Sequence, residues 1–415
     1  MSEERGSATA GRRAAATRGP NGATGDGSSG GRGVRVRDGL VYCLKVFLGV
    51  RIALFIVATI GVALLPSLRA VSVPGWPGAA TTPGWHNLFT AWERFDGLWF
   101  LQIAAHGYAA HDGSAAFFPL YPLAIRWLSF AIGGHPYAAA LIVSNVAMFV
   151  SLLLLYALSR REFDQDIARR SVLYLAVFPT SFFLFAPYSE SLFLMLVLAC
   201  FWWMRRGRWE LAGLAGALAA LTRNLGVLLV LPMLVEALEL SRPSGRRAWV
   251  PVAWSLAPIA GAVAYLGYWQ ARIGDWLAPV HQQATWQRVG QNPLVTLWHA
   301  TYDAYRFAGI YAGGYHQLDW LIAVPVLAAA VYVAIRMRPS YGVYVWASIL
   351  APLSFVFLPR PLMSFPRFAL PLFPVYWALA RWTKGRPVAQ QLVLAGSGIL
   401  LGTMLLLFVN WYYIF

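Results

Sequence analysis

Short clusters of basic residues separate long apolar runs along most of this chain, and this alternation limits the folds open to it. After the first apolar run, at residues 40–65, clusters follow near residues 160–170, 205–208, 242–247, 336–338 and 381–386. Basic residues are enriched in the cytoplasmic loops of membrane proteins. A topology of about eleven transmembrane helices puts every cluster on one side, so the pattern predicts an all-α polytopic membrane protein with a cytoplasmic N-terminus.

Composition agrees with this prediction and argues against a soluble domain. Hydrophobic residues make up 59% of the 415 residues and charged residues only 12%, whereas a soluble domain carries roughly a quarter charged residues. The net charge of +16 reflects the clusters between the spans, so we expect a lipid bilayer, and no nucleic acid, as a partner. Abundant Ala, Gly, Arg and Pro suggest a high-GC bacterial genome, and therefore a bacterial plasma membrane.

The chain divides into two predicted parts. Residues 1–38 are rich in Gly, Ser, Ala, Thr and Arg without apolar periodicity, which predicts a disordered basic cytoplasmic tail. Residues 39–415 form the predicted membrane domain, with long outer loops at about 66–136 and 272–318. The apolar segment 117–133 would put the cluster at 160–170 outside if it crossed the membrane, so we expect a helix lying in the outer interface.

The acidic residue Asp96 is the catalytic candidate. It follows the first span and lies among aromatic residues such as Phe95 and Trp99, which suit a membrane–water boundary. A carboxylate beside the bilayer is costly unless it is paired or in use. The alternative is that Asp96 only caps the short helix predicted to follow it.

Other polar residues interrupt apolar runs or flank outer turns, and these are candidates for substrate binding. They are His106, Tyr108, Tyr188, Glu190, Arg223, Asn224, Arg360 and Arg367. Arg223 can be interpreted in two ways: it forms an ion pair with Glu190, or it binds a lipid phosphate. For Arg360 and Arg367 the alternative is snorkelling to the interface. For His106 the alternative is a structural histidine whose hydrogen bonds are made at the interface.

No motif for a metal or nucleotide is found. The two cysteines, Cys43 and Cys200, lie in apolar runs, and no spacing matches a known zinc or calcium pattern. P-loop and dinucleotide-binding fingerprints are absent from the sequence. No cofactor is therefore predicted, and the need for a divalent metal is left open.

Several segments together resemble the bacterial branch of the PIG-V family of GPI mannosyltransferases. In chain order, between about Asp96 and Pro374, they are FDGLWFLQIAAHGY, AAFFPLYP, FPTSFFLFAPYSESLF, LTRNLG and PRFALPLFP. The resemblance implies a GT-C-type bundle with interfacial helices in the first outer loop and polyprenyl-phosphate mannose as the donor. It also implies that Asp96 is the acidic residue of that loop on which catalysis depends. Eukaryotic relatives work in the endoplasmic reticulum.

The sequence departs from the family pattern around the candidate base. Phe95 stands where Trp is usual, and Gly97, Leu98 and Trp99 stand where an acid and a His are common. A bacterium is not expected to make a GPI anchor. We therefore expect the acceptor to be another glycolipid, a lipoglycan or a cell-wall polymer.

These observations predict a glycosyltransferase that acts on the non-cytoplasmic face. Asp96 would deprotonate an acceptor hydroxyl, which attacks the mannose carbon in one inverting displacement. Arg223, Arg360 or Arg367 would stabilise the leaving phosphate. A lipid or sugar-lipid transporter (flippase) is the alternative, although no repeated halves are visible, and a non-enzymatic assembly partner is a third interpretation.

Overall fold

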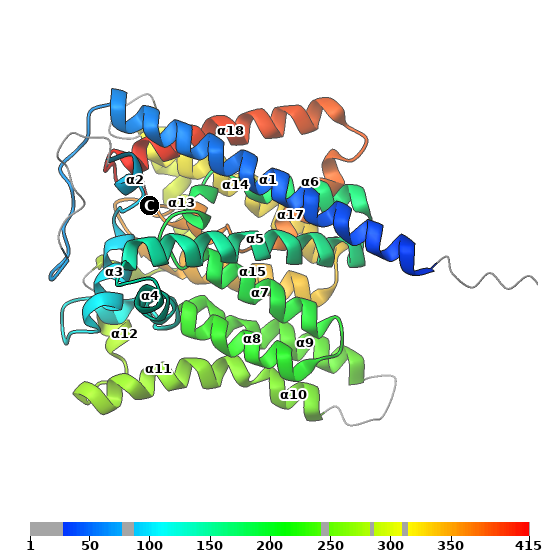
Figure 1. Cartoon of the computed structure of the whole chain (residues 1–415), viewed down its shortest axis with the longest axis horizontal. Coiled ribbons are helices and arrows are strands. Elements are labelled where there is room, and N and C mark those ends of the chain that lie inside the picture. Colours follow the sequence, from blue (N-terminus) through cyan, green and yellow to red (C-terminus); the bar gives the residue numbers. More distant parts are fainter. Residues whose placement is uncertain (1–27, 77–86, 242–248, 283–285, 309–313, 415) are drawn as a thin grey trace, which may run out of the picture. The chain divides into compact units, whose positions relative to one another are not determined.

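A computed structural model describes residues 28–76, 87–241, 249–282, 286–308 and 314–414. Residues 39–415 form one compact unit (Figure 1). The first helix, α1 (Ser28–Leu64), begins within the segment predicted to be a tail, because the helix extends N-terminally beyond the apolar run. Residues 1–27 of that tail lie outside the described part.

Helices dominate the unit, which confirms the all-α prediction. The helices of the first half are α2 (Asn87–Thr90), α3 (Asp96–His106), η1 (Ser114–Ala116), α4 (Leu120–Ala131), α5 (Pro136–Glu162), α6 (Gln165–Ala176), η2 (Ser181–Leu184), α7 (Glu190–Met204) and α8 (Trp209–Thr222). The second half has η3 (Asn224–Leu229), α9 (Val230–Ser241), α10 (Trp249–Ser255), α11 (Ala257–Ile273), α12 (Ala278–His281), α13 (Pro293–Arg306), α14 (Gly314–Arg336), α15 (Pro339–Ser354), α16 (Phe365–Phe368), α17 (Phe373–Thr383) and α18 (Pro387–Val409).

Two short strands form a small ribbon that the sequence did not predict. Strand β1 (Arg288–Gly290) pairs antiparallel with β2 (Phe355–Phe357), with Val289 opposite Val356. The ribbon fastens the loop after α12 to the end of α15, which matters for the site described below.

Five helical segments of the described chain are long and apolar enough to cross a membrane. They are Arg37–Leu64, Pro136–Glu162, Trp249–Ile273, Tyr315–Arg336 and Pro387–Val409. Two further apolar helices, α7 and α8, are shorter, and a helix needs about 20 residues to cross the hydrocarbon layer alone. The chain is thus a multi-pass membrane protein, and the total of about eleven spans stays a prediction.

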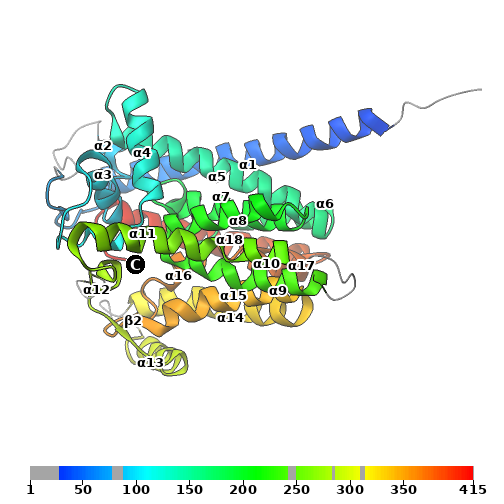
Figure 2. The same ribbon diagram turned by 90° about the horizontal axis from the view of Figure 1, so that it is seen from below.

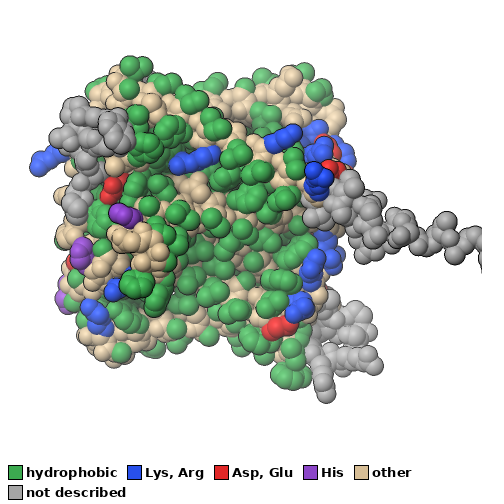
Figure 3. Space-filling model, in the orientation of Figure 1, with side chains coloured by type: hydrophobic (Ala, Val, Ile, Leu, Met, Phe, Trp, Pro, Cys, Tyr) green, Lys and Arg blue, Asp and Glu red, His purple; other side chains and the backbone are tan. Residues whose placement is uncertain are grey.

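The basic clusters meet at one end of the bundle, which we call the basic end. Arg205, after α7, pairs with Glu162 at the end of α5 (Nε–Oε1, 2.7 Å), and Arg338, before α15, lies 3.6 Å from the same carboxylate. Lys384 pairs with Asp164 (2.5 Å). Figure 3 shows many Lys and Arg side chains at this end, beyond a broad hydrophobic band. Residues 242–247 lie outside the described part.

Helix α4 lies across the bundle at the opposite end, which we call the site end. It is seen end-on in Figure 1 and upright in Figure 2, while the long helices run horizontally in both. Trp127 is 73% exposed and Phe130 is 85% exposed, as expected for side chains that contact lipid at a membrane boundary. This orientation agrees with the interfacial helix predicted for segment 117–133.

Helix α7 is shorter than α5, and it begins at a deeper level of the bundle than α5 does. The two helices end level with each other at the basic end, where Arg205 meets Glu162. At the other end of α7, the Ser144 and Ser151 hydroxyls of α5 donate to the carbonyls of Tyr188 (3.2 Å) and Ser191 (3.5 Å). At 1.5 Å per residue, these serines lie about 12 and 22 Å from the first residue of α5. The start of α7 therefore lies well inside the bundle.

The turn from α8 into η3 depends on a glycine. A Cβ added to Gly226 would lie 2.3 Å from the Ala219 carbonyl carbon and 2.3 Å from the Ala220 nitrogen. Both are backbone atoms, which cannot move aside cheaply. We expect Gly226→Ala to lower the free energy of unfolding by about 1–3 kcal/mol through overpacking, measured as a lower thermal unfolding midpoint in detergent.

The matched control is Gly396→Ala in α18, where an added Cβ meets nothing within 4 Å. That variant should unfold at or slightly above the wild-type temperature, because Ala is the better helix former. Equal midpoints for the two variants would contradict the close packing of η3 on α8.

Candidate active site

Asp96 is the first residue of α3, and the residue before it has an unusual backbone. Phe95 has φ 48° and ψ −118°, a conformation that costs a non-glycine residue about 1–3 kcal/mol and often marks functional sites. Its ring packs against Trp411 and Tyr413, with ring centres 5.3 and 5.4 Å away. The C-terminal segment therefore holds the turn that presents Asp96.

The Asp96 carboxylate pairs with an arginine instead of capping α3. No side-chain capping hydrogen bond forms at the start of α3, so the capping alternative is not what the structure shows. Arg367 Nη1, from α16, donates to Asp96 Oδ2 (2.5 Å). Arg367 Nε donates to Glu190 Oε1 at the start of α7. One buried guanidinium thus joins two carboxylates from distant segments.

Glu190 receives a second arginine. Arg223 Nη1, at the end of α8, donates to Glu190 Oε1 (2.5 Å) and to the hydroxyl of Ser189 (3.2 Å). Of the two interpretations of Arg223, the ion pair with Glu190 is therefore the one observed. The other carboxylate oxygen, Glu190 Oε2, is buried and has no hydrogen-bond partner among the described residues.

Arg288 of β1 is a third arginine of this region, and the sequence analysis missed it. Its guanidinium donates to the Ser364 hydroxyl (2.5 Å) and the Phe355 carbonyl (3.3 Å). Arg288 and Arg223 both lie over the ring of Phe368, at 5.9 and 5.4 Å. Only its position beside aromatic and amide residues in the 272–318 loop could have indicated it.

Burial and the neighbouring charged groups both affect the pKa of Arg288. Burial lowers the pKa of its guanidinium below the ordinary value, while Tyr413 and Asp96 oppose that change and Arg367 and Arg223 add to it. The same groups therefore lie near enough to interact. Among the described residues of this network, two carboxylates face three guanidinium groups, which leaves one positive charge in excess and favours an anionic ligand.

The oxygen of Asp96 that Arg367 does not hold is open. Asp96 Oδ1 has no hydrogen-bond partner among the described residues, and the side chain is 22% exposed. By contrast, the Glu190 side chain is only 2% exposed. Asp96 is therefore the carboxylate of this pair that a substrate can reach.

Tyr188 and Asn224 lie next to this network in different ways. The Tyr188 ring lies 4.9 Å from the Arg367 guanidinium, and its hydroxyl donates to the Arg94 carbonyl (2.9 Å). Tyr188 therefore packs against Arg367. Asn224 is exposed, and its Oδ1 accepts from the Leu225 amide (2.9 Å). That contact is a local turn contact outside the ion-pair network.

Arg360 is held away from the network by a partner of its own. Its Nε and Nη2 donate to Asp319 Oδ2 and Oδ1 (2.6 and 2.7 Å), in a bidentate pair. Its remaining donors reach the carbonyls of Tyr413 (3.2 Å) and Ile414 (3.0 Å). Arg360 therefore fastens the C-terminal segment to α14. Snorkelling describes neither Arg360 nor Arg367, because both are buried and paired.

His106 and Tyr108 lie at the other end of α3. A rise of 1.5 Å per residue separates His106 from Asp96 by about 15 Å along the helix. Both residues line a cavity of about 490 Å³ between α3, α4 and α11, and the Tyr108 hydroxyl donates to the Phe117 carbonyl (2.7 Å). The structure therefore does not bring them together with Asp96.

No metal ligand set can be named in the described part of the chain. The residues of the ranges given above contain no group of three or more His, Cys, Asp or Glu side chains that could hold an ion.

Sequence comparison relates the chain to membrane mannosyltransferases. The family model for dolichyl-phosphate-mannose-protein mannosyltransferases matches residues 118–269. GPI mannosyltransferase 2 of Drosophila pseudoobscura pseudoobscura is 32% identical over 111 residues, covering 24% of each chain. GPI alpha-1,6-mannosyltransferase 2 of Mus musculus is 32% identical over 145 residues, covering 32% of this chain and 29% of the mouse protein. The matched part thus spans less than a third of these relatives.

Two solved structures align with most of this chain at low sequence identity. ArnT from Cupriavidus metallidurans, bound to undecaprenyl phosphate, aligns over 84% of this chain and 63% of its own, with 17% identity and a TM-score of 0.46. The oligosaccharyltransferase AglB from Archaeoglobus fulgidus, in complex with an inhibitory peptide and a dolichol-phosphate, aligns over 88% and 56%, with 12% identity and a TM-score of 0.43.

The pairing of Arg360 with Asp319 predicts a specific pattern of stability. Asp319→Ala leaves a buried guanidinium without its carboxylate, which typically costs about 3–5 kcal/mol. The double variant Asp319→Leu/Arg360→Met replaces both charges by apolar groups and should recover most of that loss. Thermal unfolding of the purified variants in detergent measures both effects.

The matched control is the exposed pair Arg208→Ala/Glu210→Ala, whose removal should change the midpoint little. If the Asp319/Arg360 double variant were less stable than either single variant, the pair would not be the structural fastening inferred here.

Proposed function

We propose that this chain is a membrane-embedded mannosyltransferase, related to the GPI mannosyltransferases. The sequence similarity to the dolichyl-phosphate-mannose-protein mannosyltransferase model and to GPI alpha-1,6-mannosyltransferase 2 supports this proposal. Its donor would be polyprenyl-phosphate mannose, and its acceptor a hydroxyl of a glycolipid or lipoglycan. The observation that supports this proposal best is the accessible carboxylate of Asp96 beside a network with more guanidinium groups than carboxylates.

Asp96 has the geometry required of a general base. Arg367 holds one carboxylate oxygen, which fixes the orientation of the group, and Oδ1 is left to accept a proton. The acceptor hydroxyl transfers its proton to Oδ1 as its oxygen attacks the anomeric carbon of mannose. The bond from that carbon to the phosphate oxygen breaks in the same step, so the configuration inverts, and the polyprenyl phosphate leaves with the electron pair.

The arginines would stabilise the leaving phosphate. Negative charge develops on the phosphate oxygen as the sugar bond breaks, and prearranged donors stabilise that charge. Arg367 and Arg223 are already shared with carboxylates, whereas the partners of Arg288 among the described residues are a hydroxyl and a backbone carbonyl. Arg288 is therefore the guanidinium best placed to take on a phosphate without losing an ionic partner.

The position of the site in the bundle suits a lipid donor. The start of α7 lies within the span of α5, so a donor whose chain lies in the bilayer can present its phosphate at this depth. The basic clusters lie at the opposite end of the bundle, and basic loops mark the cytoplasmic side. We therefore place the site on the non-cytoplasmic face, and the composition favours the plasma membrane of a bacterium.

Asp96→Asn tests the proposed base. An amide has nearly the same shape but cannot take the proton, so transfer of radiolabelled mannose from purified donor should fall by about 10²–10⁴-fold. The measurement is the appearance of label in a new lipid or polymer, with protein reconstituted in vesicles.

The matched control is Asp303→Asn in α13, an acidic residue outside the network, which should keep wild-type turnover. Near-normal transfer by Asp96→Asn would remove Asp96 from the reaction. Labelled donor that crosses the bilayer without any labelled product would instead support a flippase.

Arg288→Gln tests the site of the leaving phosphate. Loss of one prearranged donor group should reduce turnover by about 10²–10³-fold, while Arg288→Lys should retain part of the activity because it keeps the charge. Turnover and the KM for the donor are measured together. Arg306→Gln, at the end of α13, is the control and should match the wild type; unchanged turnover in Arg288→Gln would exclude this role.

A further inference from the structure

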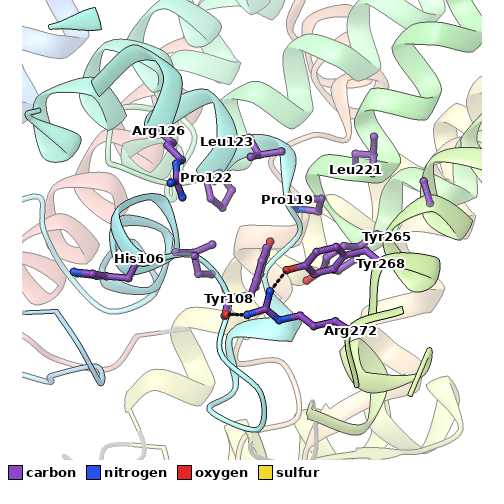
Figure 4. A pocket seen from close by; sticks show the side chains of 13 residues that line it. His106, Tyr108, Pro119, Pro122, Leu123, Arg126, Leu221, Tyr265, Tyr268 and Arg272 are labelled. Atoms are coloured by element: carbon purple, nitrogen blue, oxygen red, sulfur yellow. Dashed lines mark hydrogen bonds between the residues drawn. The ribbon is translucent and has the colours of Figure 1, made fainter. Parts of the chain in front are cut away.

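The cavity at the far end of α3 is a separate feature of the site end. It has a volume of about 490 Å³ and lies between the end of α3, the crosswise helix α4, and α11 (Figure 4). Its wall is largely apolar, with Pro119, Leu123, Leu221 and Ala264 among the lining residues. A cavity of this size accommodates a small headgroup.

Two arginines give the cavity its charge. Arg126 comes from α4 and Arg272 from the last turn of α11, on opposite sides of the cavity in Figure 4. Arg272 Nη1 donates to the Tyr268 hydroxyl (3.0 Å) and Nη2 to the Tyr108 carbonyl (2.7 Å), which fixes its orientation.

Arg126 has no hydrogen bond or ion pair with any described residue, and no acidic residue lines the cavity. The two positive charges are thus uncompensated there.

The cavity also continues onto surfaces that face lipid. Helix α11 belongs to a segment able to cross a membrane, Trp249–Ile273, so Arg272 lies at its boundary. Val263 on α11 is 48% exposed, and α4 exposes Leu123 and Trp127. An acyl chain can therefore lie along these two helices while its headgroup enters the cavity.

We propose that this cavity binds the phosphate headgroup of an anionic phospholipid of the surrounding bilayer, between Arg126 and Arg272. Charge complementarity favours an anionic headgroup over a zwitterionic one. The site is distinct from the Asp96 network, because the rise along α3 puts His106, which lines the cavity, about 15 Å from Asp96. A sugar joined directly to a phosphate held here would not reach that carboxylate. His106 lies at the rim.

Lipid titration of the full-length chain tests this site. The purified protein is delipidated in detergent and titrated with phosphatidylglycerol or phosphatidylcholine of identical chains, and bound lipid is counted by native mass spectrometry. We expect tighter binding of phosphatidylglycerol. Arg126→Gln should weaken it by about fivefold, and Arg126→Gln/Arg272→Gln by about 25-fold, from about 1 kcal/mol per basic residue at an anionic lipid. Phosphatidylcholine binding should not change.

Controls separate charge from folding. Arg69→Gln, an exposed arginine in the loop after α1, should bind like the wild type, and Arg126→Lys should keep most of the preference. Arg126 makes no side-chain bond among the described residues, so the single variant decides the test even if the double variant does not fold.

Four results would overturn the proposal. The first three are equal binding of the two lipids by the wild type, unchanged phosphatidylglycerol binding in Arg126→Gln, and full displacement by millimolar inorganic phosphate, which would indicate a simple anion site. One-for-one displacement by polyprenyl phosphate would also overturn it, because the cavity would then hold the donor lipid. The readout is binding, so loss of the proposed transferase activity would not affect it.

Discussion

The shared ion pair of Arg367 is the interaction on which the arrangement of the site depends. Asp96 begins α3 and Glu190 begins α7, and both carboxylates lie within a largely apolar bundle where an unpaired charge is costly. Arg367 contacts both, so it removes their mutual repulsion and fixes the distance between two helices at once. Removing a member of such a buried pair typically costs about 3–5 kcal/mol because it leaves an uncompensated charge. The same contact that organises the fold here therefore also orients the proposed base.

The same contacts suggest how the charges would be shared in the proposed reaction. An anionic phosphate would bind Arg288, while Arg367 continues to hold one oxygen of Asp96. Glu190, which is buried and also held by Arg223, keeps Arg367 in place. Under the proposed function, the two carboxylates that share Arg367 would differ in role: the buried Glu190 would be structural, and the more exposed Asp96 would accept the proton.

Part of this site could be predicted from the sequence, because its charged residues stand within apolar runs. Asp96, Glu190, Arg223 and Arg367 stand out because charged residues are rare in such surroundings, and the structure joins all four. Arg288 gave no such signal, since an arginine in a polar loop is ordinary, and only the β1–β2 ribbon brings it to the site. Arg360 resembled Arg367 in sequence, but its partner Asp319 lies 41 residues away on α14, and no local pattern predicts that pairing. The orientation of α4 across the bundle was predictable, because a further span at residues 117–133 would have put the basic cluster at 160–170 on the outer side.

Helix α3 connects the two anion-binding sites proposed for this end of the molecule. Its first residue belongs to the ion-pair network, and its last turn borders the cavity with Arg126 and Arg272. The network lies beside the start of α7, whereas the cavity lies beside α4 and α11, which expose apolar side chains. A phospholipid bound at the second would hold α4 and α11 together at the membrane boundary. The Tyr108 hydroxyl and the Tyr265 hydroxyl both donate to the Phe117 carbonyl (2.7 and 3.0 Å). The Phe117 ring in turn stacks on Trp99, one turn from Asp96. A lipid bound in the cavity would therefore stabilise the residues against which α3 packs.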